Sequence, residues 1–346
     1  MPRPSYPPYS ASGEDEGRVE VDRLLTATEK KVHGVYEQAA QEMKKKADAY
    51  LAQFTKEDRE RALRVANGEM TVDEYKRWRT THILQGRRYY EMAEVLAADM
   101  TNSDKIAAAI INGSLPDVFA VGYNYALYQG ELTGGFQTSF TLYDRDTVTR
   151  LMQEDPELLP VQAKINVPEE MRWNKRHISS SMTQSIMQGE MLEDIAKRLA
   201  SSVASMNERQ AIRNARTAYT SAENGGRYNG FRRLTNAGVN LVLEWCATLD
   251  SRTRHEHRLL DGQRRNVDEA FEVDGQKILY AGDPYAPQGL IWNCRCTILS
   301  WVKGFEENRE IKAAAFPDGE SYAEWKFAKQ EQAKRKEKPR YDNPAY

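Results

Sequence analysis

Apolar residues recur at helical spacing over the first part of this chain, and this spacing limits its fold more than any other feature. They fall close to every 3.6 residues from about Val19 to about Phe54, which predicts one long amphipathic helix. Thr71 and Glu74 have the spacing of a capping box and predict a second helix that runs toward Ile83. The N-terminal part of the chain is therefore expected to be mostly helical.

Further helical segments are expected along the middle of the chain. Helices are predicted at 89–100 and 104–112 and, after the segment 123–143, again from Ser179 onward. Segment 123–143 mixes tyrosine and phenylalanine with glycine and predicts a helix followed by a hairpin or an ordered loop, with a small aromatic core. Three prolines make residues 155–170 a candidate domain boundary.

One of these helices carries an arginine stripe. It is expected to begin near Asn207, and its arginines follow one another at steps of four and three, so they share a helix face: Arg209, Arg213 and Arg216. Two interpretations stay open, a solvated face with partner salt bridges and a contact to nucleic-acid phosphates.

Length and composition bound the class of protein. A chain of 346 residues has room for two ordinary domains, and 29% charged against 40% hydrophobic residues fits a well-solvated, helix-rich protein. We expect no apolar run long enough to span a bilayer, and residues 1–8 lack the apolar segment of a signal peptide. The net charge of −2 does not by itself attract DNA, so any DNA contact must come from local patches.

After Val239 the hydrophobic period switches from helical to alternating. Residues 239–245 read as a strand, and short strands are also expected at 278–280 and 296–301. The expected fold class is therefore α+β, with a mostly helical N-terminal region followed by a small α+β module.

The module holds every cysteine of the chain, together with two of its five histidines. Zinc is commonly bound by four cysteine and histidine ligands, so Cys246, Cys294, Cys296 and one histidine would complete a structural site. Unliganded buried thiols and a disulfide are the alternatives that the residues alone leave open. An odd number of cysteines argues against a secreted disulfide framework.

Basic residues gather near the C-terminus. Between Lys326 and Arg340 they outnumber the acidic residues, and the run includes Lys334, Arg335 and Lys336. A solvated tail and a contact to DNA or an acidic partner are both compatible with this pattern.

The ordered motifs of the module resemble the Mu F-like head morphogenesis family of tailed bacteriophages. The resemblance covers roughly residues 175–300 and rests on Asp250-x-Arg-Thr-Arg254-x-x-His257-x-x-Leu260-Asp261-Gly262, then Asp283-Pro284, then Asn293-Cys294-Arg295-Cys296. Upstream it includes Gly189, Arg216-Thr217 and Ala222-x-Asn224-x-Gly226-Arg227. This chain departs from the family pattern by the longer approach 286–292 to the cysteines and by a second histidine, His255.

The resemblance implies a minor head protein rather than an enzyme. It implies a place inside the virion head near the portal and a role in procapsid assembly and in DNA packaging or ejection. Synthesis in the host cytoplasm is expected from the lack of a signal-peptide segment at residues 1–8. The implied partners are the portal protein, major capsid or scaffold proteins and, through nonspecific contacts, packaged double-stranded DNA, with no membrane involved in assembly. It also implies metal binding, and His257 is preferred to His255 as the ligand because it matches the histidine of the family.

Four segments are expected on this basis. They are a disordered tail at 1–17, a helical partner-docking domain at 18–165, the Mu F-like domain at 166–304 and a polar, basic helical tail at 305–346.

Two other functions stay open from the sequence. A metal-dependent nuclease or hydrolase would use Asp250, His257 and Asp261, and a nonspecific DNA-binding protein would use the basic segments. Walker, dinucleotide-binding and nucleophile-elbow motifs are absent from the sequence.

Overall fold

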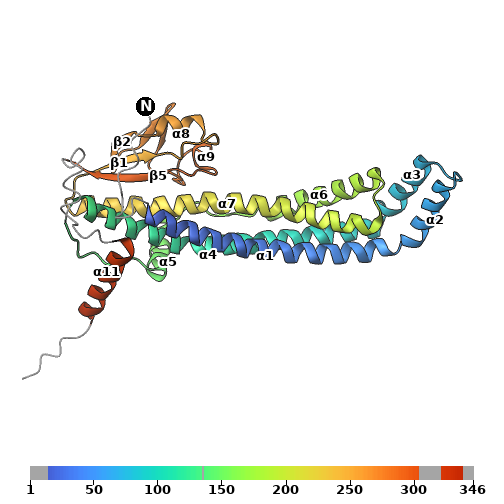
Figure 1. Ribbon diagram of the computed structural model, residues 1–346, viewed down its shortest axis with the longest axis horizontal. Helices are drawn as coiled ribbons and strands as arrows, with labels where there is room; N and C mark the ends of the chain where they lie inside the picture. The colour runs from blue at the N-terminus through green and yellow to red at the C-terminus, as the bar shows by residue number, and fades with distance from the viewer. Residues whose placement is uncertain (1–14, 135, 304–320, 338–346) are drawn as a thin grey trace, which may run out of the picture. The chain divides into compact units, whose positions relative to one another are not determined.

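The computed structural model describes residues 15–134, 136–303 and 321–337, the side chains of 335–337 excepted, and confirms the α+β class (Figure 1). Long helices dominate, and short antiparallel strands lie between residues 241 and 302. The helices are α1 (Glu16–Ala52), α2 (Thr55–Ala66), α3 (Val72–Ile83), α4 (Arg87–Gly134), α5 (Arg145–Glu154), η1 (Pro156–Leu158), α6 (Val167–Gln188), α7 (Leu192–Asn236), α8 (His255–Leu260), α9 (Gln288–Ile291) and α11 (Tyr322–Glu337). The strands are β1 (Leu241–Cys246), β2 (Arg264–Asn266), β3 (Phe271–Val273), β4 (Gln276–Ile278) and β5 (Thr297–Val302).

The first predicted helices form for the predicted reasons. Helix α1 begins at Glu16, three residues before the predicted start. Helix α3 begins with the expected capping box, in which Glu74 N–H donates to Thr71 Oγ1 at 3.2 Å and Thr71 N–H donates to Glu74 Oε2 at 2.9 Å. Residues 1–14 lie outside the described part, so the predicted N-terminal tail stays a prediction.

Several predicted helices are segments of two much longer ones. Helix α4 has 48 residues and joins the segments 89–100 and 104–112 to the aromatic region, with Pro116 inside it. Helix α7 has 45 residues and includes the arginine stripe. No strand follows α4: residues 136–144 are an ordered loop, in which Tyr143 stacks on Tyr123 with ring centroids 3.8 Å apart. Of the two predicted alternatives, a hairpin or an ordered loop, residues 136–144 form the loop, and the aromatic core is confirmed.

The expectation that no apolar run is long enough to span a bilayer is wrong. Helix α4 is long and apolar enough by length and composition, with a window of mean hydropathy 1.3. A buried helix of a water-soluble core passes the same test, and 56% of that window is buried inside the protein. We therefore interpret α4 as a core helix.

The chain divides into two compact units whose segments alternate along the sequence. Unit 1 comprises Met1–Ala27, Asn112–Gln162 and Asn214–Tyr346, and unit 2 comprises Thr28–Ile111 and Ala163–Arg213. Helices α1, α4 and α7 contribute residues to both units. The four consecutive segments predicted from the sequence, with the roles assigned to them, stay a prediction.

Unit 2 is helical and has a hydrogen-bonded polar core. The Tyr36 hydroxyl donates to Asp104 Oδ1 at 2.8 Å, and Asn174 Nδ2 donates to Asp104 Oδ2 at 3.1 Å and to Thr101 Oγ1 at 3.0 Å. Asn207 Nδ2 donates to Asn174 Oδ1 at 2.8 Å. These five buried residues, called the Asp104 network below, come from α1, α4, α6 and α7 and fix the register of the four helices.

In unit 1, α4 and α7 approach each other too closely for side chains at two glycines. A Cβ on Gly122 would lie 2.1 Å from the Glu223 carbonyl oxygen, and one on Gly226 would lie 2.2 Å from that of Phe119. Real Cβ atoms do not approach backbone so closely, so glycine is required at both positions.

The strands of unit 1 form a three-stranded antiparallel sheet in the order β2-β1-β5 (Figure 1). A separate hairpin consists of β3 and β4. Asp274 and Gly275 at the hairpin turn both have positive φ, as a two-residue turn of type I′ requires. In the sheet, Leu243 and Trp245 of β1 are fully buried. The sheet therefore gives the module a packed base beside the cysteines.

Candidate metal centre

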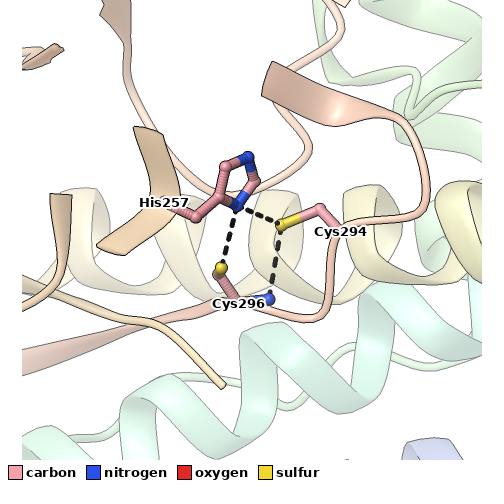
Figure 2. A group of neighbouring side chains, drawn as sticks. All are labelled: His257, Cys294 and Cys296. Carbon is pink, nitrogen blue, oxygen red and sulfur yellow. Dashed lines mark hydrogen bonds between the residues drawn. The ribbon is translucent and has the colours of Figure 1, made fainter. Parts of the chain in front are cut away.

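His257, Cys294 and Cys296 form one buried group, called the His–Cys group below (Figure 2). Nδ1 of His257 lies 3.1 Å from Sγ of Cys296 and 3.4 Å from Sγ of Cys294, and all three ligand atoms lie within 4.8 Å of one another. Each residue is at most 3% exposed. Helix α8 supplies the histidine, and the turn between α9 and β5 supplies both cysteines.

The contact with Arg254 assigns the tautomer of the His257 imidazole in this arrangement. Nη2 of Arg254 lies 3.0 Å from Nε2 of His257. Because a guanidinium can only donate, Nε2 accepts and Nδ1 carries the ring proton of a neutral imidazole, which it donates to Cys296. A metal ion bound at Nδ1 would replace that proton.

The two thiols differ in acidity. The hydrogen bonds from the Cys296 thiol and backbone N–H lower the pKa of the Cys294 thiol below its ordinary value. The same thiol–thiol bond, with burial second, raises the pKa of Cys296. These hydrogen bonds therefore favour the thiolate at Cys294 over the thiolate at Cys296.

Helix α7 holds the cysteine turn through three polar side chains on one face. Thr220 Oγ1 donates to the Cys294 carbonyl at 2.8 Å, and Thr217 Oγ1 accepts from Asn293 N–H at 2.8 Å. The Asn224 amide donates to the Cys296 carbonyl at 3.2 Å and accepts from Ile298 N–H at 3.0 Å. These bonds orient a turn in which Asn293 has a φ of 50°.

The structure does not bring Cys246 into the His–Cys group. In the β1–β5 register Cys246 lies opposite Thr297, which neighbours Cys296 in the chain. Successive residues of a strand point to opposite faces, so the register places Cys246 and Cys296 on different sides. All three cysteines are described, and none forms a disulfide. His255 is exposed at the start of α8, whereas His257 reaches the cysteines.

The acidic residues of the motif have structural partners. The Asp250 carboxylate accepts hydrogen bonds from both terminal nitrogens of Arg295 at 2.7 Å. This pairing holds the pKa of the Asp250 carboxyl well below its ordinary value. Asp261 accepts from Ala247 N–H at 2.9 Å, and Asp283 accepts from the backbone N–H groups of Leu279 and Tyr285. These carboxylates fix turns around the centre, which is not the arrangement that the nuclease interpretation expects.

A small cavity of about 30 Å³ adjoins the group, which is enough room for a water molecule. The cavity is lined by the three residues of the His–Cys group and, among others, by Thr248, Thr253 and Asn293. Two sulfur ligands and one imidazole fit zinc by ligand type, and they supply three of the four ligands of a tetrahedral site.

The basic residues predicted to contact DNA or a partner lie elsewhere. Arg209, Arg213 and Arg216 are exposed on α7, the first two in unit 2 and the third in unit 1. Lys334 is exposed on α11 and pairs with Glu331 at 2.9 Å, whereas the side chains of Arg335 and Lys336 lie outside the described part.

Sequence reasoning missed the supporting residues of α7. Thr217 and Asn224 belonged to the motif resemblance, but nothing in it indicated that they hold the cysteine turn. With Thr220 they lie at steps of three and four, so they form a polar stripe on a helix that buries them. That buried polar stripe is the signal that could have found them.

Comparison with known proteins agrees with the motif resemblance. The family described as "Phage Mu protein F like protein" matches residues 176–299, which contain the His–Cys group and its α7 support. The minor head protein GP7 of Bacillus phage SPP1 is 25% identical over 327 residues, which are 89% of this chain and 95% of that protein.

A second relative carries an enzyme name. The NAD(+)–arginine ADP-ribosyltransferase EFV of Enterococcus faecalis is 26% identical over 267 residues, which are 75% of this chain. The chain spans about half of that relative, 53% of its length. No solved structure gives a significant match. The family match at 176–299 and the likeness to GP7 over most of the chain show that this chain is similar to the phage Mu F-like minor head proteins.

Proposed function

We propose that this chain is a minor head protein of a tailed bacteriophage that joins the procapsid at the portal and acts in DNA packaging or ejection. The observation that supports this role most is the likeness to a minor head protein over 95% of the length of that protein. The proposed location is the head interior near the portal, and the proposed partners are the portal and the major capsid or scaffold proteins.

The His–Cys group is proposed to bind one structural zinc ion. His257, Cys294 and Cys296 would hold it, and Cys246 leaves the set because the β1–β5 register directs it away. Bound zinc would cross-link α8 to the turn before β5. The cross-link would close the loop between these elements, which is where a constraint stabilises a small module most.

A structural role also explains the carboxylates. A hydrolase needs a carboxylate or water poised at the metal, whereas Asp250 and Asp261 are engaged by Arg295 and by a backbone N–H. The ADP-ribosyltransferase name belongs to a relative of which this chain covers about half, so it assigns no activity to this chain. We therefore propose that the chain is not an enzyme.

Weak contact with packaged DNA is part of the proposal. Arg209, Arg213 and Arg216 are exposed, as is Lys334, and Arg335 and Lys336 follow in the same helix. Such contacts carry no base information. The affinity for DNA should therefore fall steeply with salt and be equal for unrelated sequences, and tight sequence-selective binding would contradict this part.

Procapsid composition tests the role. The tagged chain would be co-expressed with the portal, scaffold and major capsid proteins of its phage, and procapsids would be isolated with and without the portal. We expect the chain in portal-containing procapsids and its loss when the portal is omitted. Equal amounts in both would rule out the portal as the docking partner, and absence from both would rule out the head role.

A further inference from the structure

Helix α11 docks on unit 1 through one well-defined face. Tyr322, Trp325 and Lys329 lie at steps of three and four and are buried, whereas Phe327 on the other side is 65% exposed. The residues that receive this face, called the acceptor face below, are Tyr125, Tyr128 and Glu131 of α4 with Glu16 and Glu20 of α1.

Aromatic rings form the centre of this contact. The ring centroid of Tyr322 lies 5.1 Å from that of Tyr125, in an edge-to-face arrangement, and 5.4 Å from that of Tyr128. Trp325 lies 5.5 Å from Tyr128. Tyr322 and Trp325 are each 3% exposed, so α11 buries two large anchors of the kind that dominate protein interfaces.

Charge complementarity fixes the position of the helix. Glu131, whose side chain is 1% exposed, accepts from Lys329 Nζ at 2.8 Å and from Trp325 Nε1 at 2.6 Å. At the rim, Lys326 Nζ pairs with Glu20 at 3.0 Å, and Glu16 accepts from Tyr322 N–H at 2.9 Å. The acceptor face is therefore acidic and aromatic, and it selects a basic, aromatic helix.

Two features separate α11 from an ordinary core helix. It has 16 residues, and an isolated helix of that length is only marginally stable in water, so it needs an acceptor face to stay folded. The covalent connection from Lys303 to Ser321 can span at most about 60 Å, which is enough to reach a neighbouring molecule.

We propose that the acceptor face is an interaction surface for α11 of a second copy of this chain. Exchange would need no new chemistry, because the intermolecular contacts are those already formed within one chain. At low concentration the helix of the same chain wins, because covalent linkage raises its local concentration at the acceptor face. Exchange therefore requires copies held close together, and it does not depend on the proposed head role.

Two single substitutions test the exchange. In a chain with Lys329→Glu, the altered helix would face Glu131 of an intact acceptor face. In a chain with Glu131→Lys, an intact helix would face an altered acceptor face. Each variant alone should release α11 and stay a single chain. Mixing them regenerates one wild-type contact, between the acceptor face of the first variant and the helix of the second.

The measurement is light scattering after size exclusion, with hydrogen exchange of residues 321–337. We expect a two-chain species and renewed protection of α11 only in the mixture. Lys334→Glu is the matched control for Lys329→Glu, because Lys334 is exposed and pairs with Glu331 within α11. When the Lys334→Glu and Glu131→Lys chains are mixed, both should stay at single-chain mass. A mixture of the two test variants that stays at single-chain mass, or variants that keep α11 protected, would overturn the proposal.

A peptide keeps the proposal testable if the Glu131→Lys chain does not fold. The wild-type peptide Ser321–Glu337 should bind the Lys329→Glu chain, and the same peptide with Lys329→Glu should bind much more weakly. Equal binding of the two peptides, or no binding of either, would show that the acceptor face does not take this helix from outside.

Discussion

The His–Cys group of unit 1 and the Asp104 network of unit 2 are both polar and both buried, but their atoms suit different partners. In the Asp104 network, hydroxyls and amides donate to oxygens at 2.8–3.1 Å, so protein groups satisfy it. The His–Cys group brings two sulfurs, which are weak hydrogen-bond partners, together with one imidazole nitrogen, and all three are good zinc ligands. Burial of polar atoms therefore does not distinguish a structural network from a metal centre, whereas the type of ligand atom does.

The largest expected effect is on the Asp104 network. Asp104→Leu leaves the Tyr36 hydroxyl and the Asn174 amide without this acceptor, and we expect a loss of about 2–4 kcal/mol in the free energy of unfolding. Urea denaturation measures it. Asp99→Ala on the same helix removes a half-exposed pair with Lys46 and should cost at most about 1 kcal/mol. Equal losses in both variants would show that the network contributes nothing beyond a surface pair.

The support of the cysteine turn should affect metal affinity next. Asn224→Ala removes the bonds to the Cys296 carbonyl and to Ile298 N–H, and we expect zinc to bind about 10- to 100-fold more weakly. Competition with a chromophoric chelator measures the affinity. Asn229→Ala is the control, because Asn229 bonds only to the Gly225 carbonyl of its own helix among the contacts described. An unchanged affinity in Asn224→Ala would mean that α7 does not orient the ligands.

Substitution of Arg254 should instead strengthen zinc binding. Zinc at Nδ1 leaves the ring proton of His257 on Nε2, where it faces the donor Nη2 of Arg254. Arg254→Gln offers an acceptor there and should strengthen zinc binding several-fold, by up to about 10-fold. Arg254→Met, which removes the donor and offers no acceptor, should give a smaller gain. Weaker binding in both variants would show that the guanidinium supports the centre.

The pH dependence of unit 2 should give the smallest effect. Burial raises the pKa of Asp104 despite the hydrogen bonds from Tyr36 and Asn174, and the pKa of Glu170 is raised by burial and by Asp104. A raised native pKa means that the native state holds the proton more tightly than the unfolded chain. The stability that this tighter proton binding contributes is fully present below the ordinary aspartate pKa, and it is lost as the pH rises through the native pKa.

Asp104→Asn should remove that loss. Relative to the variant, the wild-type protein should become less stable as the pH rises from about 4 toward neutrality, because about 3.9 is the ordinary aspartate pKa. Urea denaturation at a series of pH values measures the difference. A difference that does not change with pH would show that Asp104 titrates as it does in the unfolded chain.

Local patterns in the sequence were enough to predict the helical half and the fold class. Helical spacing predicted α1, and the capping box at Thr71 and Glu74 formed as predicted, because both depend on neighbours within a few residues. Ligand chemistry selected Cys294 and Cys296, and the resemblance selected His257; the structure brings these three residues together. The prediction of Cys246 as fourth ligand was of a different kind. The direction of its side chain depends on the register between β1 and β5, which its own segment does not encode.

Long-range contacts could not be read from the sequence. The basic run near the C-terminus predicted a solvated tail or a contact to DNA or an acidic partner, and nothing in it indicated that Lys329 is buried against Glu131, 198 residues away in the same chain. Arg227 pairs with Asp15 across 212 residues in the same way. The two units also arise from long-range contacts. The predicted domain boundary between residues 165 and 166 would cut through both of them.

Metal content tests most directly the claim that the His–Cys group is a zinc centre without Cys246. The wild-type chain, Cys246→Ser and the double variant Cys294→Ser, Cys296→Ser would be purified without chelators and analysed for zinc. The account predicts about one zinc ion per chain in the wild type and in Cys246→Ser and none in the double variant, whose residues 240–300 should also become more sensitive to protease. Zinc lost in Cys246→Ser as completely as in the double variant, or no zinc in the wild-type chain, would contradict it.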